Sequence, residues 1–63
     1  MIIEAPKGSN IYSAIRETKD KMKELNLSES TLVFNDIYIT VSSDSNDSDL
    51  VTIYSLRQEL RRR

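Results

Sequence analysis

The stretch that decides the fold is Thr31-Leu32-Val33-Phe34-Asn35-Asp36-Ile37-Tyr38-Ile39-Thr40-Val41-Ser42. Asn35-Asp36 suits a two-residue turn, because both residue types tolerate positive φ better than most. A turn there sets Phe34 opposite Ile37, and directly opposed residues share a face. One face then collects the large apolar side chains: Leu32, Phe34, Ile37, Ile39 and Val41. A slip of one residue would scatter this set over both faces, so the pattern predicts a β-hairpin in this register.

The second face of the predicted hairpin is partly apolar. It carries the side chains of Thr31, Val33, Tyr38 and Thr40. Tyrosine is enriched in binding hot spots because it brings a large contact area with few torsions. We therefore predict a protein-binding surface that includes Val33, Tyr38 and Thr40, with Tyr54 as a further member. The alternative is a solvated face whose Tyr and Thr residues reflect ordinary strand composition.

The segment before the hairpin has the clearest helical pattern in the chain. Apolar positions over residues 11–25 recur at spacings of three and four, with Ala14 beside the stripe: Ile11, Ile15, Thr18, Met22 and Leu25. Ser9 or Asn10 is a suitable N-cap. Asn26 suits the left-handed position after the helix, where Leu27 could pack back on Met22. These signals predict a helix over residues 11–25.

The C-terminal segment, residues 50–63, is compatible with two structures. Residues 50–54 have strand composition, which allows a third strand followed by a short basic helix. Asp47 or Ser48 is a suitable N-cap for a helix, however, and four apolar side chains share a helical stripe: Leu50, Ile53, Leu56 and Leu60. We favour the helix and keep the strand as the alternative.

The two ends of the hairpin region complete the expected order of elements. Met1–Glu4 is predicted as a short edge strand that Pro6 stops. Residues 42–49 contain no apolar side chain and are predicted to form a flexible polar surface loop. The expected fold is therefore one α+β domain over residues 1–63, in the order β-α-β-β-α. Its simplest architecture is a small antiparallel sheet covered on one face by two helices.

Several kinds of chemistry lack the residues they require. The 63 residues include no Cys, no His and a single Gly. Disulfides, a structural zinc site, nucleophilic catalysis and a glycine-rich phosphate cradle are therefore not expected. Asp44, Asn46 and Ser48 match three positions of a calcium loop, but the Gly and the terminal Glu of that loop are missing. We predict a protein that is not an enzyme and needs no metal or cofactor.

Charge is nearly balanced, with nine Lys and Arg against ten Asp and Glu. The exception is a local concentration of arginines near the C-terminus, namely Arg57, Arg61, Arg62 and Arg63, of which residues 61–63 form a basic tail. These side chains could hold a phosphate backbone or an acidic protein surface. The alternative is that they are solvated, and the chain carries no nucleic-acid recognition motif.

Length and hydropathy suggest where such a chain acts. No segment is apolar for the 18 or so residues that a bilayer span requires, and the N-terminus lacks a basic region of the secretory type. We expect a cytoplasmic protein that does not enter membranes. A chain of 63 residues builds a thin core, so self-association as a homodimer is one way to stabilise it.

The C-terminal half resembles a known group of proteins. The hairpin residues 33–41, the polar loop and residues 49–57 are similar to small proteins of bacteriophages and prophages of low-GC Gram-positive bacteria. The resemblance implies a protein that binds and inhibits or redirects a host protein, and it supplies no catalytic residue. The alternatives are a nucleic-acid-binding accessory protein that uses the C-terminal arginines, or a subunit of a larger assembly.

Overall fold

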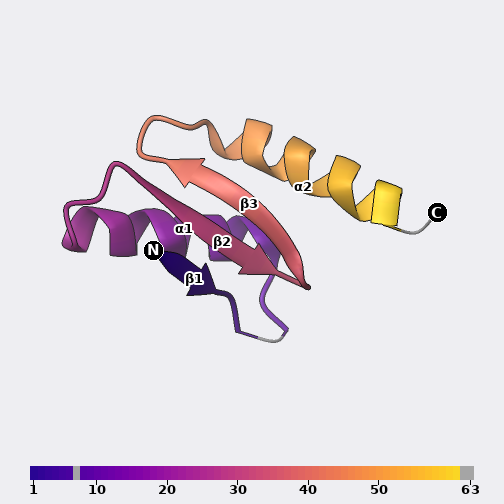
Figure 1. The fold of residues 1–63 in the computed structure, drawn as a ribbon, viewed down its shortest axis with the longest axis horizontal. Coiled ribbons are helices and arrows are strands. Elements are labelled where there is room, and N and C mark those ends of the chain that lie inside the picture. The colour runs from indigo at the N-terminus through magenta and orange to yellow at the C-terminus, as the bar shows by residue number, and fades with distance from the viewer. Residues whose placement is uncertain (7, 62–63) are drawn as a thin grey trace.

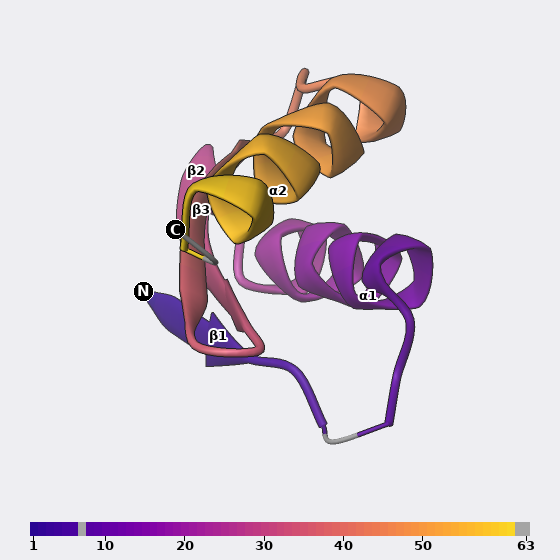
Figure 2. The ribbon, with the colours of Figure 1, turned by 90° about the vertical axis from the view of Figure 1, so that its right-hand side faces the viewer.

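A computed structural model describes residues 1–6 and 8–61 of the chain. The elements are β1 (Ile2–Glu4), α1 (Ile11–Glu24), β2 (Glu29–Phe34), β3 (Ile37–Ser42) and α2 (Asp47–Arg61). The strands form one sheet in the order β1-β2-β3. Both helices lie on the same side of this sheet (Figures 1 and 2). The predicted α+β fold, with its β-α-β-β-α order and two helices on one face, is confirmed.

The β2–β3 hairpin has the predicted turn and register. Asn35 and Asp36 form the turn with φ of 50° and 64°. Phe34 lies opposite Ile37, and Ser30 lies opposite Val41. Positive φ at both turn residues gives the local twist that matches a right-handed pair of strands. The turn chemistry and the sorting of apolar side chains therefore select the same register.

Substitution of Asp36 tests this turn. Asp36→Val is expected to lower the free energy of unfolding by about 1–2 kcal/mol, because a β-branched residue is strained at positive φ. Asp36→Gly is the matched control and should stay at least as stable as the wild type, since Gly adopts this φ freely. Urea denaturation followed by circular dichroism measures both. An Asp36→Val variant as stable as Asp36→Gly would show that the residue does not adopt positive φ.

The prediction that the sheet is antiparallel is wrong for β1. β1 pairs with β2 in parallel, with Ile3 beside Leu32. The amide of Thr31 donates to the carbonyl of Met1 at 2.9 Å, and the amide of Ala5 donates to that of Val33 at 2.9 Å. The reason is topological. In the chain, α1 connects β1 to β2 and runs back along the sheet, so β2 starts at the same end of the sheet as β1 did. The sheet is therefore mixed.

Helix α1 begins and ends with side-chain and backbone caps. The Asn10 side chain accepts a hydrogen bond from the amide of Ser13 at 2.8 Å, so Asn10 rather than Ser9 is the N-cap. At the other end Asn26 has a φ of 60°, and the amide of Leu27 donates to the carbonyl of Met22 at 2.8 Å. This is the predicted left-handed ending. Leu25, which was expected on the buried stripe, is exposed, and Leu27 packs against the core instead.

The core lies between the helices and the inner face of the sheet. Its apolar members are Ala14, Ile15, Met22, Leu32, Phe34, Ile37, Ile39, Val41, Leu50 and Tyr54. Thr18 is also fully buried, and its hydroxyl donates to the carbonyl of Ala14 at 2.8 Å. The buried Thr18 hydroxyl therefore has a hydrogen-bond partner, as buried polar groups normally do.

Residues 47–61 form a helix, as favoured, but its start and its buried face differ from the prediction. The Asn46 side chain accepts from the amide of Ser48 at 2.8 Å, so the cap lies one residue before the expected Asp47. The polar loop is correspondingly short, spanning residues 43–46. The expected buried stripe is wrong beyond Leu50, because its other three members are exposed: Ile53, Leu56 and Leu60.

Tyr54 explains the orientation of α2. Its ring meets the ring of Phe34 edge to face, with centroids 5.1 Å apart and an interplanar angle of 82°. Aromatic pairs favour this geometry because the positive edge of one ring meets the negative face of the other. The contact turns Tyr54 and Leu50 toward the sheet and leaves the other apolar side of α2 outside. In the described part of the chain, neither helix has the length and apolar character needed to cross a bilayer.

Candidate protein-binding surface

Among the described residues, one face of the sheet has no helix against it (Figure 2). We call it the open face. Alternation along the three strands assigns eight side chains to it: Ile2, Glu4, Glu29, Thr31, Val33, Tyr38, Thr40 and Ser42. Three of the four residues predicted to bind protein, Val33, Tyr38 and Thr40, are therefore brought together here.

The register places a large apolar side chain of the open face on each edge strand, Ile2 on β1 and Tyr38 on β3, with Val33 on β2 between these strands. Ile2 lies beside Thr31, which is opposite Thr40, and Glu4 lies beside Val33, which is opposite Tyr38. Ile2 and Tyr38 are 66% and 58% exposed. Strand residues of this size remaining in water on one side of a small sheet mark a candidate interaction site.

Sequence reasoning missed Ile2 as a member of this surface. The sequence did contain a signal for it. Successive side chains of a strand point to opposite faces, so one of the two residues Ile2 and Ile3 must lie on the face away from the core. What the sequence did not supply was the parallel pairing with β2, which places Ile2 beside Thr31.

The open face is acidic. None of the three strands contains Lys or Arg, whereas Glu4 and Glu29 lie on the open face and Asp36 lies at the hairpin turn. The Lys and Arg residues of the described part are all on the two helices: Arg16, Lys19, Lys21, Lys23, Arg57 and Arg61. The helices also carry acidic residues, so charge is mixed on the helix side, whereas the charged side chains of the open face are both carboxylates.

Tyr54 does not belong to the open face. It lies on the opposite side of the sheet and is only 6% exposed. Its hydroxyl accepts a hydrogen bond from the side-chain amide of Asn35 at 3.1 Å. Tyr54 therefore supports the hairpin from inside, and the surface predicted from Val33, Tyr38, Thr40 and Tyr54 is reduced to its first three members.

Two of the C-terminal arginines, Arg57 and Arg61, contact the hairpin. The guanidinium of Arg57 donates to the backbone carbonyl of Tyr38, and that of Arg61 donates to the carbonyl of Asn35 at 2.9 Å. Arg61 also lies 3.7 Å from the carboxylate of Asp36. These bonds join α2 to the end of the hairpin, while both side chains remain exposed. Arg62 and Arg63, the rest of the predicted basic surface, lie outside the described residues.

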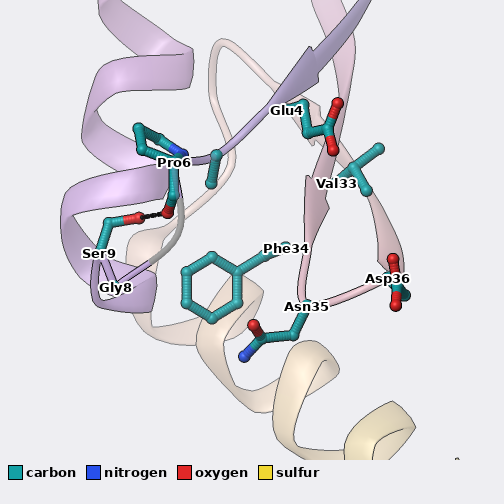
Figure 3. Close-up of a pocket in the computed structure, with 9 residues that line it drawn as sticks. Glu4, Pro6, Gly8, Ser9, Val33, Phe34, Asn35 and Asp36 are labelled. Atoms are coloured by element: carbon teal, nitrogen blue, oxygen red, sulfur yellow. Dashed lines mark hydrogen bonds between the residues drawn. The ribbon is translucent and has the colours of Figure 1, made fainter.

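A pocket of about 160 Å³ opens at the end of the sheet, between residues 4–6 and 8–9 on one side and the hairpin turn on the other (Figure 3). Figure 3 shows the Phe34 ring on one side of β2, and Val33 with Glu4 on the other. Pockets for small-molecule ligands usually measure about 300–1,000 Å³. This one is smaller, and through Glu4 and Val33 it is continuous with the open face.

A second hollow, of about 400 Å³, lies at the C-terminal end of α1 and includes Lys19 and Ser43. Lys19 is already engaged there, because its ammonium donates to the carboxylate of Asp47 at 2.6 Å and to the carbonyl of Ser45. The pair joins α1 to the first turn of α2. The Lys19 contacts at this hollow therefore hold the two helices together.

Within residues 1–6 and 8–61, no three acidic side chains come close enough to hold a metal ion. Comparison of the chain with protein-family models, curated proteins and solved structures finds no match. The assignment of a function therefore depends on the surfaces described above.

Proposed function

We propose that the chain is a small non-catalytic binding protein that engages a partner protein through its open face. The observation that carries the proposal is the exposure of both Ile2 and Tyr38 on the open face, against which no helix of the described residues packs. An exposed tyrosine opposite an aliphatic side chain, as Tyr38 is opposite Val33, has the composition of a binding hot spot.

The charge of the open face defines the chemistry of the partner. Glu4 and Glu29 lie on the open face together with its apolar side chains, and Asp36 lines the end pocket. Complementary charges speed association and exclude partners of like charge. The partner that fits is a protein surface with an apolar centre and surrounding Lys or Arg side chains. One of these side chains can enter the 160 Å³ pocket, with its stem on Phe34 and its charge near Glu4 or Asp36.

The source of the partner follows from the sequence resemblance. Similarity of the C-terminal half to small phage and prophage proteins supports a phage-encoded chain that binds and inhibits a host protein. The bacterial cytoplasm is then the compartment in which it acts. A subunit of a larger assembly would use the same surface, with a permanent partner in place of a host target.

Nucleic-acid binding through the C-terminal arginines has weaker support. Arg57 and Arg61 are hydrogen-bonded to the hairpin. The open face would repel phosphates, because its charged side chains, Glu4 and Glu29, are carboxylates. A labelled DNA or RNA duplex is therefore expected to show no binding at physiological salt.

Tyr38→Ser tests the open face. We expect this variant to bind the partner at least about 30-fold more weakly, the loss typical of a hot-spot side chain. Tyr12→Ser is the matched control, because Tyr12 is 57% exposed but lies on α1. The partner is first captured from a lysate of a low-GC Gram-positive bacterium on immobilised wild-type protein. Its dissociation constants for the three forms are then measured by calorimetry.

A partner that Tyr12→Ser releases and Tyr38→Ser retains would contradict the proposal. Charge is tested separately, since raising the salt concentration or introducing Glu4→Lys should weaken a basic partner further. Equal binding by Glu4→Lys would show that the partner is not basic at this position. Circular dichroism of each variant establishes that it is folded before binding is compared.

A further inference from the structure

We infer that the free edge of β1 pairs with the same edge of a second copy of this chain, so that the two sheets join into one. β1 is an outer strand of the sheet (Figure 1). The contact lies in the plane of the sheet and leaves the open face of each copy accessible. The pairing therefore does not depend on the proposed function.

The backbone of β1 presents hydrogen-bonding groups along this edge. The carbonyl of Met1 and the amide of Ala5 both bond to β2, at 2.9 Å in each case. Because successive residues of a strand direct their backbone groups to opposite sides, Ile2 and Glu4 direct their amides and carbonyls away from β2. Among the described residues, no strand lies on that side. The chemical group that matches such an edge is the backbone of another extended strand.

The opposite edge of the sheet, on β3, is closed at both ends by the chain itself. The carbonyl of Tyr38 accepts a hydrogen bond from the guanidinium of Arg57. At the far end of the strand, the amide of Ser42 donates to the hydroxyl of Ser45 at 3.2 Å, and the amide of Ser45 donates to the carbonyl of Ser42 at 3.0 Å. Proteins commonly protect edge strands by covering them, so β1 is the edge that another strand can join.

The burial of Ile3 indicates what the added strand supplies. Ile3 lies beside Leu32, which is fully buried on the helix side of the sheet. Ile3 faces the same side but is only half-buried, because it belongs to the outer strand. An apolar side chain at the same level of an added strand would complete its burial.

A second copy supplies this side chain from its own β1. When the two β1 strands run antiparallel about a two-fold axis at Ile3, each Ile3 lies opposite the other. Ile2 then lies opposite Glu4 of the second copy, and the two residues exchange both backbone hydrogen bonds, because each directs its amide and carbonyl outward. Ile3 occupies the position without hydrogen bonds, where facing Cα atoms are about 4.5 Å apart and the side chains are closest.

Charge and proline favour this register over a shifted one. With the axis at Ile3, each Glu4 faces the aliphatic Ile2, so like charges do not stand opposite each other. With the axis at Glu4, the two carboxylates would face each other. Ile2 would then lie opposite Pro6, which has no amide to donate. The β1 segment is therefore self-complementary about Ile3.

The expected dimer is weak. β1 has three residues, so the strand pair is shorter than a standard interface, which buries about 800 Å² per partner. We expect monomer and dimer to exchange in a concentration-dependent equilibrium. A chain with one thin core also gains stability from the association.

Cross-linking through a single introduced thiol tests the register. The chain contains no Cys, so Ile3→Cys carries one thiol only. Across the two-fold axis the two thiols fall within the Cα separation of about 4.4–6.8 Å that is usual for disulfides. Under mild oxidation, most of the Ile3→Cys protein should become a disulfide-linked dimer of twice 7.3 kDa.

Ile2→Cys is the control for the cross-linking. Residue 2 is more exposed than residue 3, at 66%. In the dimer its two copies are diagonal neighbours about 7–8 Å apart, too far for an unstrained disulfide. Ile2→Cys should therefore cross-link at least about tenfold more slowly than Ile3→Cys. Cross-linking of Ile2→Cys at the same rate or faster is the result of random collision and would overturn the pairing.

Sedimentation velocity of the full chain tests the backbone contact. The wild type should move from 7.3 kDa toward twice that mass as concentration rises. Ile2→Pro removes the outward amide and leaves the bonds to β2 in place, since proline is tolerated where an edge amide faces solvent. Ile2→Ala is the matched control, because it loses most of the side chain and keeps the amide. The dissociation constant of the Ile2→Pro dimer should exceed that of the Ile2→Ala dimer at least about tenfold, because the symmetry removes the bond twice.

The same measurements can overturn the inference in three ways. Equal dissociation constants for Ile2→Pro and Ile2→Ala would show that the β1 backbone is not in the contact. A wild type of 7.3 kDa at every concentration would overturn the dimer. If that monomer bound a basic protein more weakly as Ile2→Pro than as Ile2→Ala, the edge would belong to a strand of that protein. A dimer that Leu56→Glu abolishes and Ile2→Pro leaves intact would place self-association on α2 instead. Circular dichroism establishes that each variant is folded before its association is compared.

Discussion

Ile39→Ala is expected to leave most of the chain unfolded at 37 °C. Ile39 is buried at the centre of β3, opposite the buried Leu32. Removing most of a buried Ile side chain costs about 2–5 kcal/mol, because packing is lost and a cavity remains. A single core of this size supplies on the order of 3–5 kcal/mol in total. The loss therefore consumes most or all of the stability, which urea denaturation and thermal melting followed by circular dichroism will measure.

Two conservative variants separate the loss of packing from a general effect on β3. Ile39→Val removes one methylene group and should cost about 0.5–1.5 kcal/mol. Thr40→Val changes the next residue, which lies on the open face, and should shift stability by about 0.5 kcal/mol or less. If Ile39→Ala melted at the same temperature as Thr40→Val, Ile39 would not be a core residue and the register of the hairpin would be wrong.

The parts of the fold that follow from local chemistry were predictable. The turn residues Asn35 and Asp36, together with alternation on either side, determine the pairing of β2 with β3. α1 carries its own apolar stripe, N-cap and left-handed ending at Asn26. Each of these signals lies within a few residues of the structure it specifies, so no knowledge of distant contacts was needed.

The parts that depend on distant contacts were not predictable. β1 has three residues, too few to show a pattern, and its parallel partner is decided by the path of α1. The predicted binding surface consequently omitted Ile2, because the pairing of β1 with β2 could not be predicted. On α2, the spacing of apolar residues predicted that the side of the helix with Ile53, Leu56 and Leu60 is buried. The contact between Tyr54 and Phe34 instead buries a different side of the helix. That contact joins residues 20 positions apart, which local spacing does not reveal.

The same contact separates two roles for the tyrosines of this chain. Tyr38 and Tyr54 were both predicted as binding residues because tyrosine is common in interfaces. Their surroundings differ, since Tyr38 is exposed on the open face and Tyr54 packs on Phe34. Loss of Tyr38 should therefore weaken binding in a folded protein. Loss of Tyr54 should weaken binding only because fewer molecules are folded.

Tyr54→Ala is accordingly expected to destabilise the chain by about 3–5 kcal/mol, as for other large aromatic residues removed from a core. The variant loses the ring contact with Phe34 and the main attachment of α2 to the hairpin. Tyr54→Phe retains the ring and loses only the hydrogen bond from Asn35, at a cost of about 0.5–1.5 kcal/mol. The lower end of that range is expected, because the exposed Asn35 amide can bind water instead.

Binding and stability measured on the same variants decide between a core and an interface role for Tyr54. Tyr54→Phe should bind the partner as tightly as the wild type does, while Tyr54→Ala should bind in proportion to its folded fraction. Addition of saturating partner should also refold Tyr54→Ala, because a ligand that binds only the native state shifts the equilibrium toward it. A Tyr54→Phe variant of nearly unchanged stability with tenfold weaker binding would place the Tyr54 hydroxyl in the interface. The open face would then no longer account for recognition by itself.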